Sequence, residues 1–159
     1  MAEETLAAYT EPSPLAAVHV ARTFPAPRER VFRAWTEAEA VRRWFGTRGA
    51  MIDSVETDVR VGGRYTITIK VPPTMRKAHV GGTYLEVTPP ERLVFTWAWT
   101  KMPPAFGMGD SKVTVEFDEV GDGTEVRLTH ELLDKGRLRS FHRFGWRGSM
   151  RRLGDYLGR

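Results

Sequence analysis

The stretch His142–Leu157, HRFGWRGSMRRLGDYL, has the periodicity of a helix with one buried face. At 100° per residue, one side carries His142, Trp146, Ser149, Met150, Leu153 and Leu157. The opposite side carries Arg143, Arg147, Arg151 and Asp155. We therefore expect a helix from about residue 134 to 157 that covers an apolar surface elsewhere in the chain.

That surface is predicted between Met51 and Glu131, where apolar and polar residues alternate with a period of two. Turn signals occur at Pro72-Pro73, Pro89-Pro90 and Gly121–Gly123, and no helical run separates them. The pattern favours an antiparallel meander that forms a curved sheet. The inward residues are expected to be Tyr65, Ile67, Ile69, Leu93, Phe95, Trp97, Trp99, Val113, Val115, Phe117, Val126, Leu128 and His130.

The segment before the meander predicts one strand and two short helices. Val18, Val20 and Phe24 alternate in a strand, and a helix follows over residues 26–35 with Pro27 in its first turn. A second helix is expected over residues 37–45, capped by Thr36 in a capping box with Glu39 and ended by Gly46. The fold class is thus α+β, in the order β-α-α-β(5-6)-α.

Composition limits the possible classes of protein. The 159 residues contain no cysteine, which excludes a disulfide framework and thiolate zinc sites. No apolar run approaches the roughly 18 residues of a membrane span. We expect residues 1–16 to be a flexible tail, residues 17–159 to be a single domain, and the protein to be cytoplasmic without a membrane span.

The formal net charge of +4 is unevenly distributed. Residues 135–159 hold eight basic residues against Asp155, a local charge of +7, so the other 134 residues sum to −3. A basic helix can bind nucleic acid, but no nucleic-acid motif accompanies this one. A solvated helix face is the favoured interpretation, and no nucleic-acid partner is expected.

Small residues on the last helix indicate a cavity. Gly145, Gly148 and Ser149 lie beside Trp146 and leave room between the helix and the sheet, a typical small-ligand site. The alternative is that aromatic side chains fill this space. The predicted lining is Phe32, Trp35, Trp44, Tyr65, Phe95, Trp97, Trp99, His130, His142 and Trp146, and the loops at 71–76 and 101–110 are candidates for its mouth.

His130 and His142 are the weak catalytic candidates. Both are predicted to face the cavity, where burial would favour a neutral acid/base group, but two hydrogen-bonded structural histidines are the favoured alternative. His130-Glu131-Leu132-Leu133-Asp134 resembles the zinc-protease motif without its second histidine, so no metal or other cofactor is expected.

Several segments together are similar to the family named after the activator of heat-shock protein 90 ATPase, within the START-like, birch-pollen-allergen-like superfamily often labelled SRPBCC. The resemblance covers about residues 17–157. It is carried by RTFPAPRERVFRAWTEAEAVRRWFG (22–46), VRVGGRYTITI (59–69), GGTYLEVTPPERLVFTWAW (81–99), SKVTVEFDEVGDGTEVRLTHE (111–131) and HRFGW (142–146).

This resemblance implies a helix-grip fold, in which an antiparallel sheet wraps around a long C-terminal helix and leaves a hydrophobic cavity between them. The first functional hypothesis is therefore binding of a small lipophilic or aromatic molecule by a monomer or homodimer. A second hypothesis is a chaperone partner that uses the basic helix face with Phe141 and Phe144. A third is a cyclase- or hydrolase-type enzyme that uses the two histidines.

Overall fold

The computed structural model describes residues 17–100, 111–131 and 136–158. The predicted tail at residues 1–16 and the predicted mouth loop at 101–110 lie outside these residues. The described part begins with strand β1 (Val18–Phe24), continues through helices α2 (Arg28–Thr36) and α3 (Ala38–Trp44), and then forms six further strands. These strands are β2 (Met51–Thr57), β3 (Arg64–Val71), β4 (Arg76–Thr88), β5 (Arg92–Thr100), β6 (Ser111–Val120) and β7 (Gly123–Glu131).

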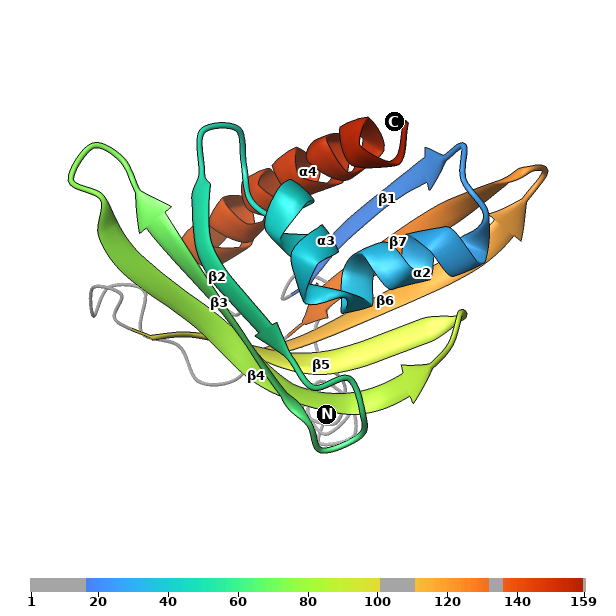
Figure 1. The fold of residues 1–159 in the computed structure, drawn as a ribbon, viewed down its shortest axis with the longest axis horizontal. Coiled ribbons are helices and arrows are strands. Elements are labelled where there is room, and N and C mark those ends of the chain that lie inside the picture. Colours follow the sequence, from blue (N-terminus) through green and yellow to red (C-terminus); the bar gives the residue numbers. More distant parts are fainter. Residues whose placement is uncertain (1–16, 101–110, 132–135, 159) are drawn as a thin grey trace, which may run out of the picture.

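The seven strands form one antiparallel sheet in the order β1-β7-β6-β5-β4-β3-β2. Each strand from β2 to β6 pairs with the next along the chain, as a meander predicts, and β7 pairs with β1, from Val18↔His130 to Phe24↔Thr124. The sheet curls into a half-barrel (Figure 1), and its concave side holds the helices. The predicted helix-grip architecture is confirmed, with six strands after the two short helices.

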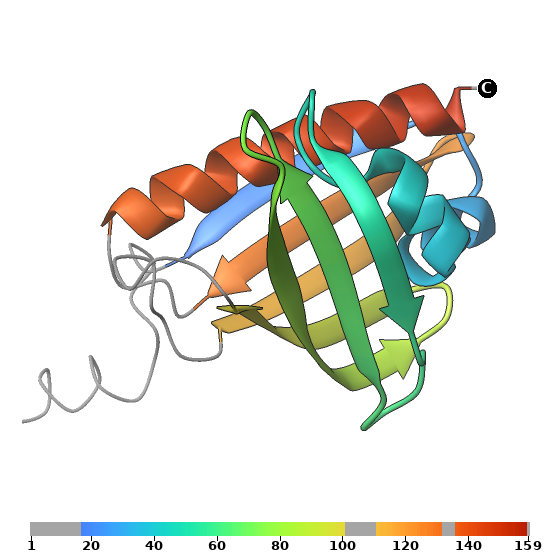
Figure 2. The same cartoon turned by 60° about the vertical axis from the view of Figure 1, so that its left-hand side comes forward.

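The last helix, α4 (Gly136–Leu157), runs diagonally along the open side of the curled sheet (Figure 2). Its buried residues are Leu138, His142, Trp146, Ser149, Met150, Leu153 and Leu157, whereas Arg147, Arg151 and Asp155 are exposed. This is the division that the helical periodicity predicts, except that Arg143 is half-buried. Helix α4 packs against β1 and α3. Its His142 and Trp146 side chains also form hydrogen bonds with side chains of the inner strands β5 and β7.

The junction between α2 and α3 differs from the prediction. Thr36 is the last residue of α2, and its hydroxyl donates a hydrogen bond to the Phe32 carbonyl at 3.1 Å. The residue that precedes α3 is Glu37, which makes no side-chain cap. The predicted capping box from Thr36 to Glu39 is therefore wrong, although Gly46, with φ of 93°, does follow the end of α3 as expected.

Candidate ligand-binding site

A cavity of about 460 Å³, here called the large cavity, lies between α4, the middle of the sheet and the loop that joins α3 to β2. Lining residues come from helix α4, from the loop between α3 and β2, from strand β5, which supplies two tryptophans, and from the β3–β4 hairpin. Its described lining residues are Phe45, Gly46, Thr47, Arg48, Gly49, Ala50, Ile69, Lys70, Val71, Pro72, Ala78, Trp97, Trp99, Phe141, His142, Phe144, Gly145, Trp146 and Ser149.

The small residues of α4 explain why this space is open. A Cβ atom placed on Gly145 would meet no heavy atom within 4 Å, so this position of the helix faces the unfilled volume of the large cavity. A larger residue there would project into the cavity. Gly145 therefore leaves room between the helix and the sheet, as the sequence predicted.

Gly148 has a different role from the one predicted. A Cβ atom at this position would lie 2.9 Å from Cγ2 of Thr47 and 3.3 Å from its Cα. The missing side chain therefore lets the loop between α3 and β2 pack directly against α4. Gly148 holds a wall of the large cavity in place, whereas Gly145 leaves space inside it.

Hydrogen bonds fix the same loop onto α4. The Gly46 amide donates to Ser149 Oγ at 2.9 Å, and Arg152 Nη1 donates to the Phe45 carbonyl at 2.9 Å. Arg152 also reaches the carbonyl of Thr47, at 3.4 Å. Because these contacts join residues more than 100 positions apart in sequence, folding of α4 onto the loop builds this wall of the cavity.

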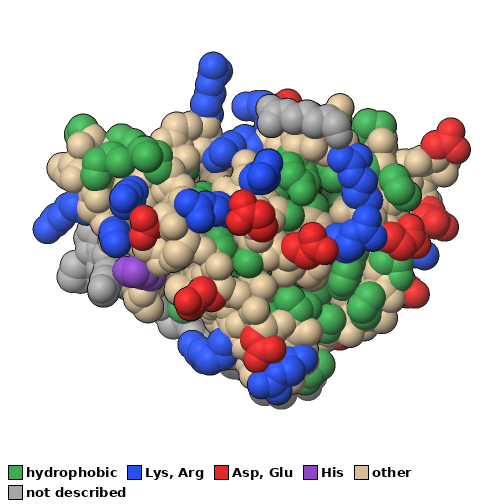
Figure 3. Space-filling model, viewed as in Figure 1, with side chains coloured by type: hydrophobic (Ala, Val, Ile, Leu, Met, Phe, Trp, Pro, Cys, Tyr) green, Lys and Arg blue, Asp and Glu red, His purple; other side chains and the backbone are tan. Residues whose placement is uncertain are grey.

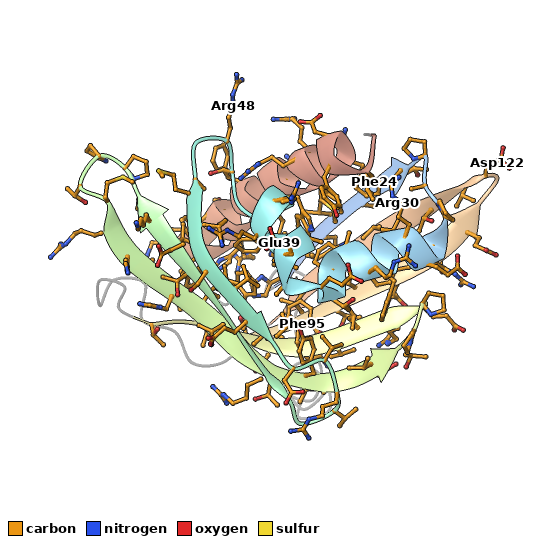
Figure 4. All side chains as sticks on the ribbon, in the orientation of Figure 1. Phe24, Arg30, Glu39, Arg48, Phe95 and Asp122 are labelled. Atoms are coloured by element: carbon orange, nitrogen blue, oxygen red, sulfur yellow. The ribbon has the colours of Figure 1, made fainter. Side chains whose placement is uncertain are left out.

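A second cavity of about 40 Å³, here called the small cavity, lies deeper in the core. It shares Phe45, Trp97 and Trp146 with the large cavity. The Trp97 and Trp146 rings are 4.8 Å apart at their centroids, so they pack closely where the two cavities meet. Phe95 extends into the centre of the fold (Figure 4) and lines the small cavity with Trp35, Val41, Trp44, Val55, Thr57, Tyr65, Ile67 and Tyr84.

His142 lies in the wall of the large cavity and holds two tryptophan side chains. Its Nδ1 is 2.7 Å from the Leu138 carbonyl, which can only accept, so Nδ1 carries the hydrogen and Nε2 is the acceptor. Trp99 Nε1 donates to that Nε2 at 3.0 Å, and Trp97 Nε1 donates to it at 3.3 Å. One imidazole lone pair therefore accepts from two indole N–H groups.

His130 is fully buried and has the opposite tautomer. Ser111 Oγ donates to the Trp97 carbonyl at 2.8 Å and lies 2.7 Å from His130 Nε2, so it accepts a hydrogen bond from that nitrogen. His130 Nδ1 in turn accepts from Trp146 Nε1 at 3.0 Å. Each ring nitrogen of both histidines thus has a partner, and the two rings lie 4.7 Å apart.

Burial keeps both imidazoles neutral. Loss of hydration lowers the pKa of His130 well below its usual value, and the neighbouring His142 lowers it further. The pKa of His142 is also lowered, mainly by burial, against the opposing effect of its hydrogen bond to Leu138. At neutral pH neither His130 nor His142 is therefore a charged imidazolium.

The structure separates the predicted lining residues into three groups. Four of them line the large cavity, namely Trp97, Trp99, His142 and Trp146, of which Trp97 and Trp146 also line the small one. Four others line the small cavity alone, namely Trp35, Trp44, Tyr65 and Phe95. Phe32 and His130 line neither of these two cavities. Phe32 packs against Phe117 in the core, with ring centroids 5.3 Å apart, and His130 supports Trp146 from behind.

The main part of the site that the sequence analysis missed is the loop from Phe45 to Ala50. Its small residues Gly46, Gly49 and Ala50, next to an aromatic residue, are the signal that could have suggested a cavity wall. Of the predicted mouth segments, Val71 and Pro72 do line the large cavity. The segment 101–110 is outside the described residues.

Apolar side chains also border the large cavity on the surface. Phe144 is 72% exposed and Phe141 is 39% exposed, and both line this cavity. Among the described lining residues, the charged side chains are those of Arg48 and Lys70. Arg48 points away from the body of the protein (Figure 4). On the face of the molecule that Figure 3 shows, basic and acidic side chains are interspersed with hydrophobic ones.

Within the described ranges, no group of three or more His, Asp or Glu side chains is arranged to hold a metal ion. In the same residues, no helix has the length and apolar character required to cross a membrane. The described site is therefore an apolar cavity with hydrogen-bonding groups at its histidine end.

A half-barrel sheet that wraps around a C-terminal helix, with a cavity between them, defines the helix-grip class of protein. The family model described as Activator of Hsp90 ATPase homolog 1-like protein matches residues 25–158. The chain therefore belongs to this family, as the sequence resemblance predicted.

Solved structures share the fold. Protein CV1439 from Chromobacterium violaceum is 26% identical with a TM-score of 0.82, and the match covers 91% of this chain and 98% of that one. Protein NE0264 from Nitrosomonas europaea is 22% identical with a TM-score of 0.77, covering 92% and 96%. CalU16 from Micromonospora echinospora is 24% identical with a TM-score of 0.67, covering 92% and 81%. No functionally curated protein matches the chain significantly.

Proposed function

We propose that the protein binds a small lipophilic or aromatic molecule in the large cavity. The observation that carries this proposal is the open volume next to Gly145, which is walled mainly by apolar and aromatic side chains, among them the exposed Phe141 and Phe144. Helix-grip proteins of this superfamily commonly bind ligands in the corresponding cavity, which supports the same conclusion.

The size of the large cavity suits a ligand of one to two rings. Its 460 Å³ falls within the usual range for small-molecule sites, about 300–1,000 Å³. An apolar cavity of about 150 Å³ is already enough to hold benzene. A ligand with about a dozen heavy atoms that gains roughly 0.5 kcal/mol from each would bind with a dissociation constant of tens of micromolar.

Titration with 2-ethylnaphthalene by isothermal calorimetry tests the proposal, using two variants of one residue. Gly145→Leu places a branched side chain in the empty volume, so we expect binding to weaken at least tenfold. Gly145→Ala adds one methyl group and should retain most of the affinity. Failure of the wild-type protein to bind 2-ethylnaphthalene or other lipophiles of similar size, or equal binding by Gly145→Leu, would contradict the proposal.

Association with a chaperone is a second candidate function, favoured by the exposure of Phe144 beside the arginines of α4. The family is named for activators of the Hsp90 ATPase, which makes that ATPase the relevant assay. If the interaction exists, the wild-type protein should stimulate the ATPase of an Hsp90-type chaperone. The charge-reversed triple variant Arg143→Glu, Arg147→Glu, Arg151→Glu should not, and no stimulation by the wild type would reject this candidate.

For His130 and His142 we infer a structural role rather than catalysis. Both nitrogens of each ring already have a hydrogen-bond partner, and each ring accepts from at least one tryptophan. A base in a catalytic site needs a free lone pair directed at the substrate. These contacts instead favour a role in orienting Trp97, Trp99 and Trp146.

A further inference from the structure

The hydrogen bonds at the histidine end of the large cavity are unbalanced. His142 Nε2 has one lone pair in the plane of its ring, and the indoles of Trp97 and Trp99 both donate to it. The bond from Trp99 is 3.0 Å long, whereas that from Trp97 is longer, at 3.3 Å, and is therefore the weaker of the two. One indole N–H in this group is therefore only weakly satisfied.

His142 has no means of correcting this imbalance. Its Nδ1 hydrogen is used by the Leu138 carbonyl at 2.7 Å, so the ring is held in one orientation and one tautomer. Protonation would remove the only acceptor and leave both indoles without a partner, and burial opposes it. His142, Trp97 and Trp99 together can therefore offer one indole N–H to a ligand, but they have no acceptor that is not already in use.

All three side chains of this group line the large cavity. Ser149, also in its lining and 2% exposed, accepts a hydrogen bond from the Gly46 amide, which leaves its own hydroxyl hydrogen to be donated. The described lining residues include no aspartate or glutamate. The side chains at this end of the cavity thus have more donors than acceptors.

We propose that the ligand of the large cavity carries a hydrogen-bond acceptor oxygen of the carbonyl type on an apolar body, and that this oxygen binds the indole N–H that His142 satisfies only weakly. The second indole then keeps the Nε2 lone pair for itself, so the ligand completes the hydrogen bonds of the group. Ligands whose only polar group is an ammonium or another pure donor are disfavoured because His142, Trp97 and Trp99 offer them no acceptor that is not already in use. This inference rests on the proposed ligand-binding function and specifies the chemistry of its ligand.

The test compares two probes of nearly equal shape, 2-acetylnaphthalene with a carbonyl and 2-ethylnaphthalene without one. We expect Trp99→Phe to lower the affinity for the ketone, relative to the hydrocarbon, by roughly three- to tenfold. The reason holds whichever indole binds the ketone. With Trp99 removed, Trp97 has the His142 lone pair to itself, and no surplus donor remains.

Phe144→Leu is the matched control, since it removes an aromatic ring from the same cavity but no hydrogen-bond donor. It should change the affinity for both probes by the same factor. If the wild type binds both probes and Trp99→Phe leaves their affinity ratio unchanged, the acceptor inference is overturned while the proposed function stands. If the wild type binds neither probe, the proposed function fails, and this inference fails with it.

An infrared measurement on the wild-type protein provides a second readout that does not depend on any variant folding. The carbonyl stretching band of bound 2-acetylnaphthalene should lie at lower frequency than in a hydrocarbon solvent, because the carbonyl accepts a hydrogen bond. A band of the bound ketone at the hydrocarbon-solvent position would overturn the inference.

Discussion

At the scale of single residues, the two buried histidines hold three of the five tryptophans by hydrogen bonds. His142 accepts from Trp97 and Trp99, His130 accepts from Trp146, and Ser111 joins His130 to the backbone of β5. Buried polar groups of this kind stabilise a fold only when every member is satisfied. Changes at single members of this network should therefore have clear energetic effects.

Ser111→Ala tests the inner part of this network. The substitution removes the acceptor for the His130 Nε2 hydrogen in a site that is almost fully buried, so we expect a loss of about 1–3 kcal/mol of unfolding free energy. Urea denaturation measures the change. Ser140→Ala, at an exposed position of α4, is the control and should stay within about 0.5 kcal/mol of the wild type. Equal stability of the two variants would contradict the assigned network.

The lowered pKa of both His130 and His142 predicts how stability depends on pH. In the unfolded chain these histidines protonate near pH 6.5, whereas the folded protein keeps them neutral to lower pH. The unfolded state thus binds more protons, so the unfolding free energy is largest above about pH 6.5 and falls as the pH decreases below it.

Urea denaturation at pH 7.5 and at pH 5.5 tests this pH dependence. The wild type should be less stable at pH 5.5. A double variant, His130→Gln with His142→Gln, should show a much smaller difference between the two pH values, whereas His19→Gln, at an exposed position, should retain it. A wild-type protein equally stable at both pH values would show that the histidines are not held neutral by the fold.

At the scale of elements, helix α4 combines two glycines with opposite structural roles. The position of Gly145 faces open space, while Gly148 is pressed against Thr47 of the α3–β2 loop. Both are in the interior of a helix, where glycine is less favourable than alanine by about 1 kcal/mol. Local propensity predicts the same gain at both positions, but packing predicts different outcomes.

We expect Gly145→Ala to raise the unfolding free energy by about 0.5–1 kcal/mol, because the added methyl group meets nothing and the helix becomes more favourable. Gly148→Ala should lower it, because the new Cβ would lie 2.9 Å from Thr47 Cγ2 and 3.3 Å from its Cα, which forces the loop to move. Thermal denaturation of both variants measures the two changes. The account would be contradicted if both substitutions were equally stabilising.

At the scale of the whole molecule, periodicity was sufficient to predict the architecture. The alternation of Tyr65, Ile67 and Ile69 and the helical spacing of the α4 face depend only on neighbouring residues, and both are confirmed. The predicted Thr36 capping box is wrong because α2 continues to Thr36. This residue therefore ends one helix instead of capping the next, and its hydroxyl donates a hydrogen bond to the Phe32 carbonyl. Local sequence patterns predict a helix or strand well where one of its faces must be buried. They predict the residues at which it begins and ends less well.

Part of the lining of the candidate site follows from the same kind of local pattern. Aromatic residues on inward positions of strands and helices could be assigned to the interior, and eight of the ten predicted residues line one of the two cavities. The loop from Phe45 to Ala50 could not be placed, because its position depends on Arg152 and Ser149, more than 100 residues later in the chain. The sharing of one His142 lone pair by two indoles likewise depends on three-dimensional distances that spacing alone does not contain.

The central claim is that the space between α4 and the sheet is an open ligand site, and nuclear magnetic resonance of the ¹⁵N-labelled protein tests it most directly. Titration with 2-ethylnaphthalene should produce saturable shifts of the backbone amides of Ile69, Ala78 and Gly145 and of the Trp99 indole, all in the lining of the large cavity. The amides of Val20 and Val126, in strands outside both cavities, should change little. An absence of saturable shifts, or shifts confined to residues away from the large cavity, would contradict the account.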